Sequence, residues 1–148
     1  MAVAKGWLFD TCLLSEIRKK RVNPGVVAWF AGIQAEKSFV SVVTLAELDV
    51  GVVKLLAQKD SQAAIMQAWV ENIKQRFANN TLGVDDATWT HWSHWQGQSL
   101  AKGHARPPMD GLLVATAQQY GLTIVTRNVR DFAPYSHIQN PWTASDLA

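Results

Sequence analysis

Four acidic side chains stand at corresponding places along the chain, each next to a predicted strand or at the start of a predicted helix. They are Asp10, Glu47, Asp110 and Asp131. The carboxyl ends of parallel strands meet at one edge of a sheet, where ligands bind. If the strands are parallel, we expect all four carboxylates to reach that one rim.

Carboxylates that lie close together repel one another, and some of their pKa values rise unless a cation is present. Hard oxygen ligands at a partly open site suit Mg²⁺ or Mn²⁺, and the chain offers no set of Cys and His residues for zinc. Such ions activate water and stabilise the charge that develops on a phosphate. The acids therefore favour metal-dependent nuclease chemistry.

Predicted strands alternate with predicted helices along the chain. Short apolar or β-branched runs predict strands at 7–9, 38–43, 81–84 and 122–126, with a last edge strand at 137–139. Amphipathic spacing predicts helices at 11–20, 26–35, 44–56, 60–77, from 85 onward and at 109–120. This alternation predicts an α/β fold with three α/β/α layers, in which helices cover both faces of a central, mainly parallel sheet of four to five strands.

Length and composition exclude several classes of protein. The 148 residues fit one domain, 1–148, and the 48% hydrophobic and 18% charged content is typical of a folded globular chain. No apolar run approaches the roughly 20 residues that span a bilayer, so no membrane partner is expected. The net charge of +2 is too small to indicate nucleic-acid binding by itself. The start lacks a signal-peptide pattern and Cys12 is the one cysteine, so we expect a cytoplasmic protein.

Four blocks of the sequence resemble a known family in their residues and in their order. They are Phe9-Asp10-Thr11 with Leu14-Ser15-Glu16 behind it, Ser41 to Leu48 with Gly51, Pro108 to Ala117, and Val125 to Phe132. Together they look like the successive blocks of PIN-domain proteins, and the chain is most similar to VapC-type toxins of the FitB-like branch. Asn140-Pro141-Trp142 also fits, so the resemblance covers nearly the whole chain.

The resemblance implies a single-domain endoribonuclease that is the toxin of a type II toxin–antitoxin pair. It implies Mg²⁺ or Mn²⁺ as cofactor, an RNA substrate, a small cognate antitoxin that inserts into a groove, and a homodimer. Asp10, Glu47 and Asp110 match the three acids of the family pattern. Asp131 or Asn128 fills the fourth position.

Other residues near these acids are candidates for polar support. Thr11, Thr126 and Asn128 carry groups that can orient a water or a carboxylate. Cys12 stands where the family usually has asparagine after Asp-Thr, so a hydrogen bond made by that amide is in question here. A thiol is a weak donor.

Each acid also has a purely structural interpretation. Asp10 is a natural N-cap for the helix after it, and Asp110 suits the positive end of its helix. Thr44-Leu45-Ala46-Glu47 matches a capping box, in which the glutamate bonds back to the N-cap amide. Asp131 suits a turn, and Thr11 suits the start of a helix.

Basic side chains are candidates for contacts with RNA phosphates. These candidates are Arg18, Lys19, Lys20, Arg21, Lys102, Arg106 and Arg127. A run such as 18–21 is most often a solvated helix end, and Arg127 is equally suited to be a counter-ion of the acids. Phosphate contacts would weaken with salt and would position RNA without reading its sequence.

Three tryptophans, Trp89, Trp92 and Trp95, recur at helical spacing, which indicates core or dimer interface in preference to base stacking. His91 and His94 share neighbouring faces of the same helix, but no third metal ligand accompanies them.

Two other functions fit the same acids. A receiver-like phospho-signalling domain also places acids and magnesium at the edge of a parallel sheet, although here the first strand ends in a single acid. A catalytically silent PIN-like module would bind RNA or a partner without cleaving it.

Overall fold

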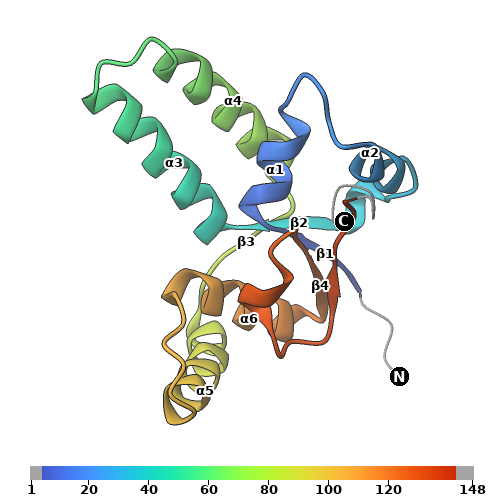
Figure 1. The fold of residues 1–148 in the computed structure, drawn as a ribbon, viewed down its shortest axis with the longest axis vertical. Helices are drawn as coiled ribbons and strands as arrows, with labels where there is room; N and C mark the ends of the chain where they lie inside the picture. The colour runs from blue at the N-terminus through green and yellow to red at the C-terminus, as the bar shows by residue number, and fades with distance from the viewer. Residues whose placement is uncertain (1–4, 143–148) are drawn as a thin grey trace.

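A five-stranded sheet forms the centre of the computed structural model, which describes residues 5–142 (Figure 1). Its strands are β1 (Gly6–Phe9), β2 (Ser38–Ser41), β3 (Thr81–Leu82), β4 (Leu122–Val125) and β5 (Ile138–Gln139). They lie in the order β3-β2-β1-β4-β5, and every neighbouring pair is parallel. The predicted parallel sheet is confirmed, with β1 at its centre.

Helices connect the strands. In the described part of the chain they are α1 (Thr11–Ile17), α2 (Pro24–Ala31), α3 (Val42–Ala57), α4 (Ala63–Arg76), α5 (Asp86–Ala101) and α6 (Pro108–Tyr120). Single turns of 3-10 helix lie at Ala35–Lys37 before β2 and at Val129–Phe132 after β4. No helix within 5–142 has the length and apolar character needed to cross a membrane.

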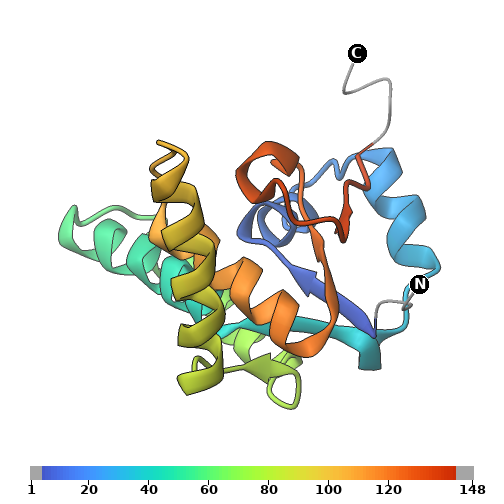
Figure 2. The same cartoon turned by 90° about the horizontal axis from the view of Figure 1, so that it is seen from below.

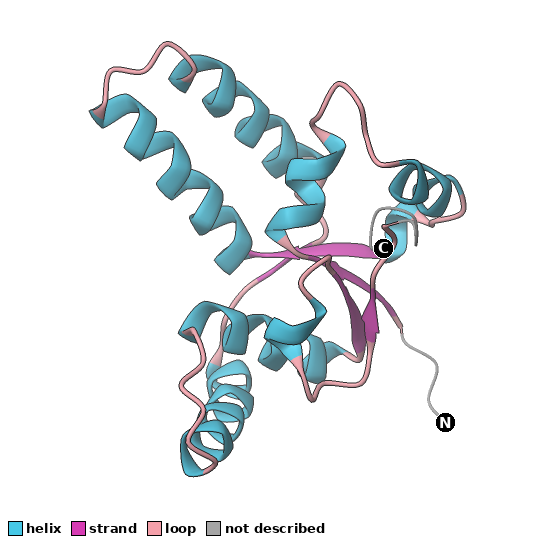
Figure 3. Ribbon diagram, viewed as in Figure 1, coloured by secondary structure: helices cyan, strands magenta, loops and turns pink. Residues whose placement is uncertain are grey.

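The helices cover both faces of the sheet, as the views in Figures 2 and 3 show. Neighbouring residues of a strand point to opposite faces. Phe9 and Val125 accordingly pack in one core with α1, α2, α4 and most of α3. Leu8 and Ile124 pack in the other core with α5 and α6. The three-layer α/β/α architecture is confirmed.

Two helix boundaries near the acids differ from the predicted ones. Helix α1 ends at Ile17, short of residue 20, because the carboxylate of Glu16 accepts hydrogen bonds from Lys19 Nζ and from the backbone N–H of Asn23, each at 3.0 Å. Helix α3 begins at Val42 instead of Thr44, because the Ser41 hydroxyl accepts from the N–H of Val43 at 3.0 Å. The predicted capping box at 44–47 is therefore wrong, since those residues lie inside the helix.

Helix α5 packs along α6 through its tryptophans. Trp95 is buried and Trp89 is 47% exposed, so the expected role as core holds for only part of the set. The indole N–H of Trp92 donates to the carbonyl of Pro108 at 3.2 Å. Helix α5 continues to Ala101, so the connection to α6 covers 102–107.

Candidate active site

Asp10 ends β1 and is both a helix cap and a candidate ligand. It is 9% exposed, and its Oδ1 accepts a 2.7 Å hydrogen bond from the N–H of Thr11. Its Oδ2 accepts from the hydroxyl of Thr126 at 2.8 Å and from the thiol of Cys12 at 3.4 Å. The capping interpretation is thus confirmed, and the other contacts show that the carboxylate is also fixed from β4. A carboxylate held in this way is ready to bind a cation without reorganising.

Thr126 and Cys12 tie the loop after β4 to the end of β1. Thr126 is fully buried, and its hydroxyl oxygen accepts from the N–H of Asn128 at 2.9 Å. The Cys12 sulfur lies 3.3 Å from that same hydroxyl and accepts from the N–H of Arg127 at 3.4 Å. Burial, with the negative charge of Asp10, raises the pKa of the Cys12 thiol. The thiol therefore stays protonated and acts as a donor.

Glu47 points toward the same edge from α3. It is exposed, and one of its carboxylate oxygens accepts from the hydroxyl of Thr11 at 3.3 Å. Partial burial raises its pKa, and the charge of Asp10 adds to that rise. Thr11 thus connects Glu47 to the Asp10 end of β1.

Asp110 lies in the first turn of α6 and is the most strongly perturbed acid of the set. Burial, together with the charges of Asp131, Asp10 and Glu47, raises its pKa to about 6, and Arg106 opposes this rise. The end of β1, helix α3 and the 3-10 turn after β4 therefore place Asp10, Glu47 and Asp131 within electrostatic reach of Asp110. Asp131 acts on Asp110 through its charge, whereas the backbone of Asn128 is bound to Thr126.

These carboxylates do not form a closed metal cage. Within residues 5–142, no three His, Cys, Asp or Glu side chains lie close enough together to surround an ion. The donors that face the edge are oxygen atoms of carboxylates and hydroxyls, which suits Mg²⁺ or Mn²⁺. Mg²⁺ in particular keeps several waters and is commonly held by one or two carboxylates, so an open arrangement fits it.

The candidate phosphate-binding residues separate into different groups in the structure. Lys19, Lys20, Arg21 and Arg127 line one cavity. Arg106 donates to the carbonyl of Asp131 at 3.2 Å and lies over the Trp95 ring at 5.4 Å, and Lys102 lines a small pocket beside it.

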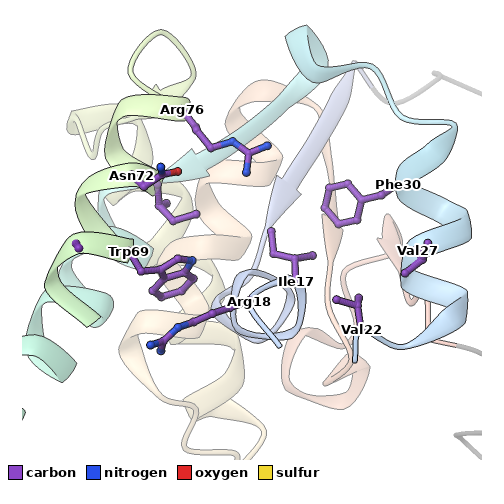
Figure 4. Close-up of a pocket in the computed structure, with 10 residues that line it drawn as sticks. Ile17, Arg18, Val22, Val27, Phe30, Trp69, Asn72 and Arg76 are labelled. Atoms are coloured by element: carbon purple, nitrogen blue, oxygen red, sulfur yellow. The ribbon is translucent and has the colours of Figure 1, made fainter. Parts of the chain in front are cut away.

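Arg18 lies apart from its neighbours in sequence. Its guanidinium stacks over the ring of Trp69, 4.9 Å from the centroid, and donates to the sulfur of Met66 at 3.1 Å. It lines an apolar groove of about 720 Å³ between α1, α2 and α4 (Figure 4). Ile17, Val22, Val27, Phe30 and Trp69 form most of its walls. The sequence did not predict this groove, because its walls come from three helices that are separate in the chain. The pattern of α2 indicated only a partly apolar helix.

The chain matches known proteins over nearly its full length. The PIN domain family matches residues 7–137. Toxin FitB of Neisseria gonorrhoeae is 33% identical over 138 residues, which are 91% of this chain and 97% of that protein. VapC ribonuclease Y4jK of Sinorhizobium fredii is 28% identical over 137 residues, which are 91% and 96% of the two chains.

A solved structure has the same fold. The crystal structure of FitAcB from Neisseria gonorrhoeae superposes with a TM-score of 0.79 at 31% identity and covers 92% of this chain and 98% of that one. The family match includes strands β1 to β4, both helical layers and the four acids Asp10, Glu47, Asp110 and Asp131, and it ends just before β5. This chain belongs to the PIN-domain family.

Proposed function

We propose that this protein is a divalent-metal-dependent endoribonuclease and the toxin of a type II toxin–antitoxin pair. The main support for this proposal is the group of acids around Asp110. Burial and the negative charges of Asp131, Asp10 and Glu47 raise the pKa of Asp110 to about 6. A bound cation would relieve the repulsion between these carboxylates. The names of the relatives, a FitB toxin and a VapC ribonuclease, agree with this chemistry.

Asp10 and Asp110 are the residues that we propose as metal ligands, with Glu47 and Asp131 completing the cluster. Mg²⁺ or Mn²⁺ held there would supply a polarised water and neutralise charge on the phosphate. The chain's own residues do the positioning. Thr126 and the N–H of Thr11 hold both oxygens of Asp10 in place.

Glu47 has a separate role in this proposal. The Thr11 hydroxyl orients one of its carboxylate oxygens, and its exposed position leaves the other oxygen open to orient a water. Its raised pKa makes it a better proton acceptor than an ordinary glutamate.

The antitoxin is proposed to occupy the apolar groove of Figure 4. A groove of about 720 Å³ lined by Val27, Phe30 and Trp69 suits an apolar segment of a small protein, and the similar FitB protein is named a toxin. The homodimer and the cytoplasmic location expected from the sequence stay predictions.

The first experiment incubates purified, antitoxin-free protein with total RNA in Mg²⁺, in Mn²⁺ or in EDTA. Beside it run Asp110→Asn and a matched control, Asp86→Asn, which changes an exposed acid at the start of α5. We expect discrete fragments from the wild-type protein and from Asp86→Asn only when metal is present, and intact RNA with Asp110→Asn. Sequencing the fragment ends would identify the RNA that is cut.

One outcome would favour another function. Intact RNA in every lane, with folded protein, would contradict the nuclease proposal and favour the catalytically silent module. We set the receiver-like alternative aside, because the PIN family match covers 7–137.

A further inference from the structure

A second cavity, of about 740 Å³, lies where α1 ends and α2 begins, facing the loop after β4. Four of its lining residues are cations: Lys19, Lys20, Arg21 and Arg127. The remaining wall is formed by Glu16, Val22, Asn23, Pro24 and Trp142. In contrast to the groove of Figure 4, its surface is therefore mainly polar and positively charged.

The one acid in this cavity is already satisfied by its neighbours. Glu16 is 6% exposed and accepts hydrogen bonds from Lys19 Nζ and the N–H of Asn23, each at 3.0 Å. Burial alone would raise its pKa, but these bonds and a further one from the Trp142 side chain outweigh burial and lower it. Glu16 is thus charged and paired with Lys19.

Three cations then remain for a ligand. Lys20, Arg21 and Arg127 form no salt bridge with any residue between 5 and 142. They come from two segments, the loop between α1 and α2 and the loop after β4, and they line the same cavity. Unpaired cations around a concave surface attract an anion, and arginine in particular matches the oxygens of a phosphate.

The cavity is connected to the proposed active site through Arg127. The N–H of Arg127 donates to the sulfur of Cys12, and the preceding residue, Thr126, donates to Asp10. On the other side, Asp10 caps the start of α1, and Lys20 and Arg21 lie in the loop that follows the seven residues of this helix, which is about 10 Å long. One short helix therefore joins the proposed active site to the basic cavity, which suits a nucleotide close to the bond that is cleaved.

We propose that this basic cavity binds the backbone phosphate of a nucleotide that flanks the cleaved bond in single-stranded RNA. The proposal rests on the proposed ribonuclease function. A recess of about 740 Å³ can enclose a nucleotide of an unpaired strand, whereas the backbone of a duplex presents its phosphates on a convex surface. Arg18, which is stacked on Trp69, is not part of this subsite.

The test measures RNA binding in the absence of cleavage. A fluorescent single-stranded RNA of about 12 nucleotides is titrated with the Asp110→Asn protein over a series of salt concentrations. The test variant adds Lys20→Gln and Arg21→Gln. The matched control adds Lys54→Gln and Lys59→Gln, which remove two exposed cations at the far end of α3.

We expect the Lys20/Arg21 variant to bind the RNA at least about tenfold more weakly than its parent at low salt. Loss of two phosphate contacts should also reduce the slope of log affinity against log salt by about 1.4, and the control pair should leave both quantities unchanged. Arg127→Gln, in the loop after β4, should also weaken binding. Thermal unfolding of each variant checks that the fold is retained.

The subsite would be overturned if the Lys20/Arg21 and Lys54/Lys59 substitutions reduced RNA affinity equally. It would also be overturned if neither the Lys20/Arg21 variant nor Arg127→Gln bound RNA more weakly than the parent. The same titration is repeated with a duplex DNA and with an acidic peptide. A loss of binding confined to either of these ligands would also overturn the subsite and would assign the cavity to that ligand. RNA binding that depends on these cations in a protein that never cleaves RNA would support the subsite and contradict the proposed function. Metal-dependent cleavage with unaltered binding in the variants would support the function and overturn the subsite.

Discussion

The hydroxyl of Thr126 donates a 2.8 Å hydrogen bond to Oδ2 of Asp10 and thereby joins the ends of two neighbouring parallel strands. The two strands are in register up to this point, because Phe9 pairs with Val125 and the N–H of Asp10 donates to the carbonyl of Val125 at 3.1 Å. Asp10 and Thr126 are therefore the first residues beyond the paired strands. The sheet itself sets the orientation of the carboxylate before any ion arrives.

Thr126→Val tests this relationship, because it keeps the shape of the side chain and removes the hydroxyl. The change leaves Oδ2 of Asp10 without its buried donor and the N–H of Asn128 without its acceptor. We expect a loss of about 1–3 kcal/mol in the free energy of unfolding. Misplacement of Asp10 should also slow RNA cleavage by about tenfold or more. Urea unfolding and the initial rate on one RNA substrate measure the two effects.

Thr126→Ser is the control, since it retains the hydroxyl and removes only a methyl group. It should recover most of the activity. Equal activities of the valine and serine variants would contradict a positioning role for the hydroxyl.

Gly6 is a position where the close approach of two strands excludes a side chain. A Cβ at Gly6 would overlap the backbone carbonyl oxygen of Lys37, just before β2, and would also press on the Phe39 ring. Backbone cannot yield as a flexible side chain does, so Gly6→Ala should cost about 2 kcal/mol and lower the melting temperature by roughly 5 °C. Gly83→Ala is the matched control, because a Cβ there meets no atom within 4 Å. Equal melting temperatures for the two variants would contradict the predicted overlap.

The sheet and the approximate position of the acids could be predicted because their signals are local. Apolar runs closed by Asp10 or by Thr126 mark strand ends, and the proline pair before Asp110 marks a helix start. Local signals also compete with one another. Thr44 and Glu47 match a capping box, but Ser41, at the end of β2, caps the helix earlier.

Side-chain partners that are distant in sequence could not be predicted. Arg18 and Arg21 belong to one basic run, yet the turn of α1 directs Arg18 to Trp69 on α4 and leaves Arg21 in the basic cavity. The partners of Cys12 could not be predicted either. The sequence shows only that a thiol stands where the family usually has an amide. The structure shows that the sulfur contacts Asp10, Thr126 and the backbone N–H of Arg127.

The raised pKa of Asp110 predicts that this acid destabilises the metal-free protein at neutral pH. Its pKa is about 6 in the folded protein and has its ordinary value near 3.8 in the unfolded chain. Between these two values the folded state binds more protons than the unfolded state, so stability falls as pH rises from about 4 to 6. Above pH 6, Asp110 is ionised in both states and destabilises the folded protein by its full amount. Asp110→Asn removes this destabilisation. Urea unfolding in EDTA at pH 7 should therefore show a free energy of unfolding that is higher by up to about 1 kcal/mol, after screening by solvent is discounted.

The gain should vanish near pH 4, where Asp110 is protonated in both states. Part of it is offset because the variant also loses a favourable charge in the first turn of α6. Addition of Mg²⁺ or Mn²⁺ should stabilise the wild-type protein and not the variant. An Asp110→Asn protein that is less stable than wild type in EDTA at pH 7 would contradict the electrostatic account, and Asp86→Asn provides the comparison for a change outside the cluster.

Cys12 offers a chemical probe of the same electrostatics. Burial and the charge of Asp10 both raise the pKa of its thiol, and only the thiolate reacts with iodoacetamide. Alkylation of the folded, metal-free protein should therefore be slow at pH 8, and its rate should level off at a higher pH than the rate of the unfolded protein does. Asp10→Asn removes the neighbouring charge and should speed the reaction by about tenfold for each unit by which the thiol pKa falls.

Because the chain has a single cysteine, mass spectrometry measures the alkylated fraction directly. Protein unfolded in guanidinium gives the reference rate. Restricted access alone would slow alkylation equally at every pH, so a rate that levels off at the ordinary thiol pKa would show that access, and not the charge of Asp10, protects Cys12.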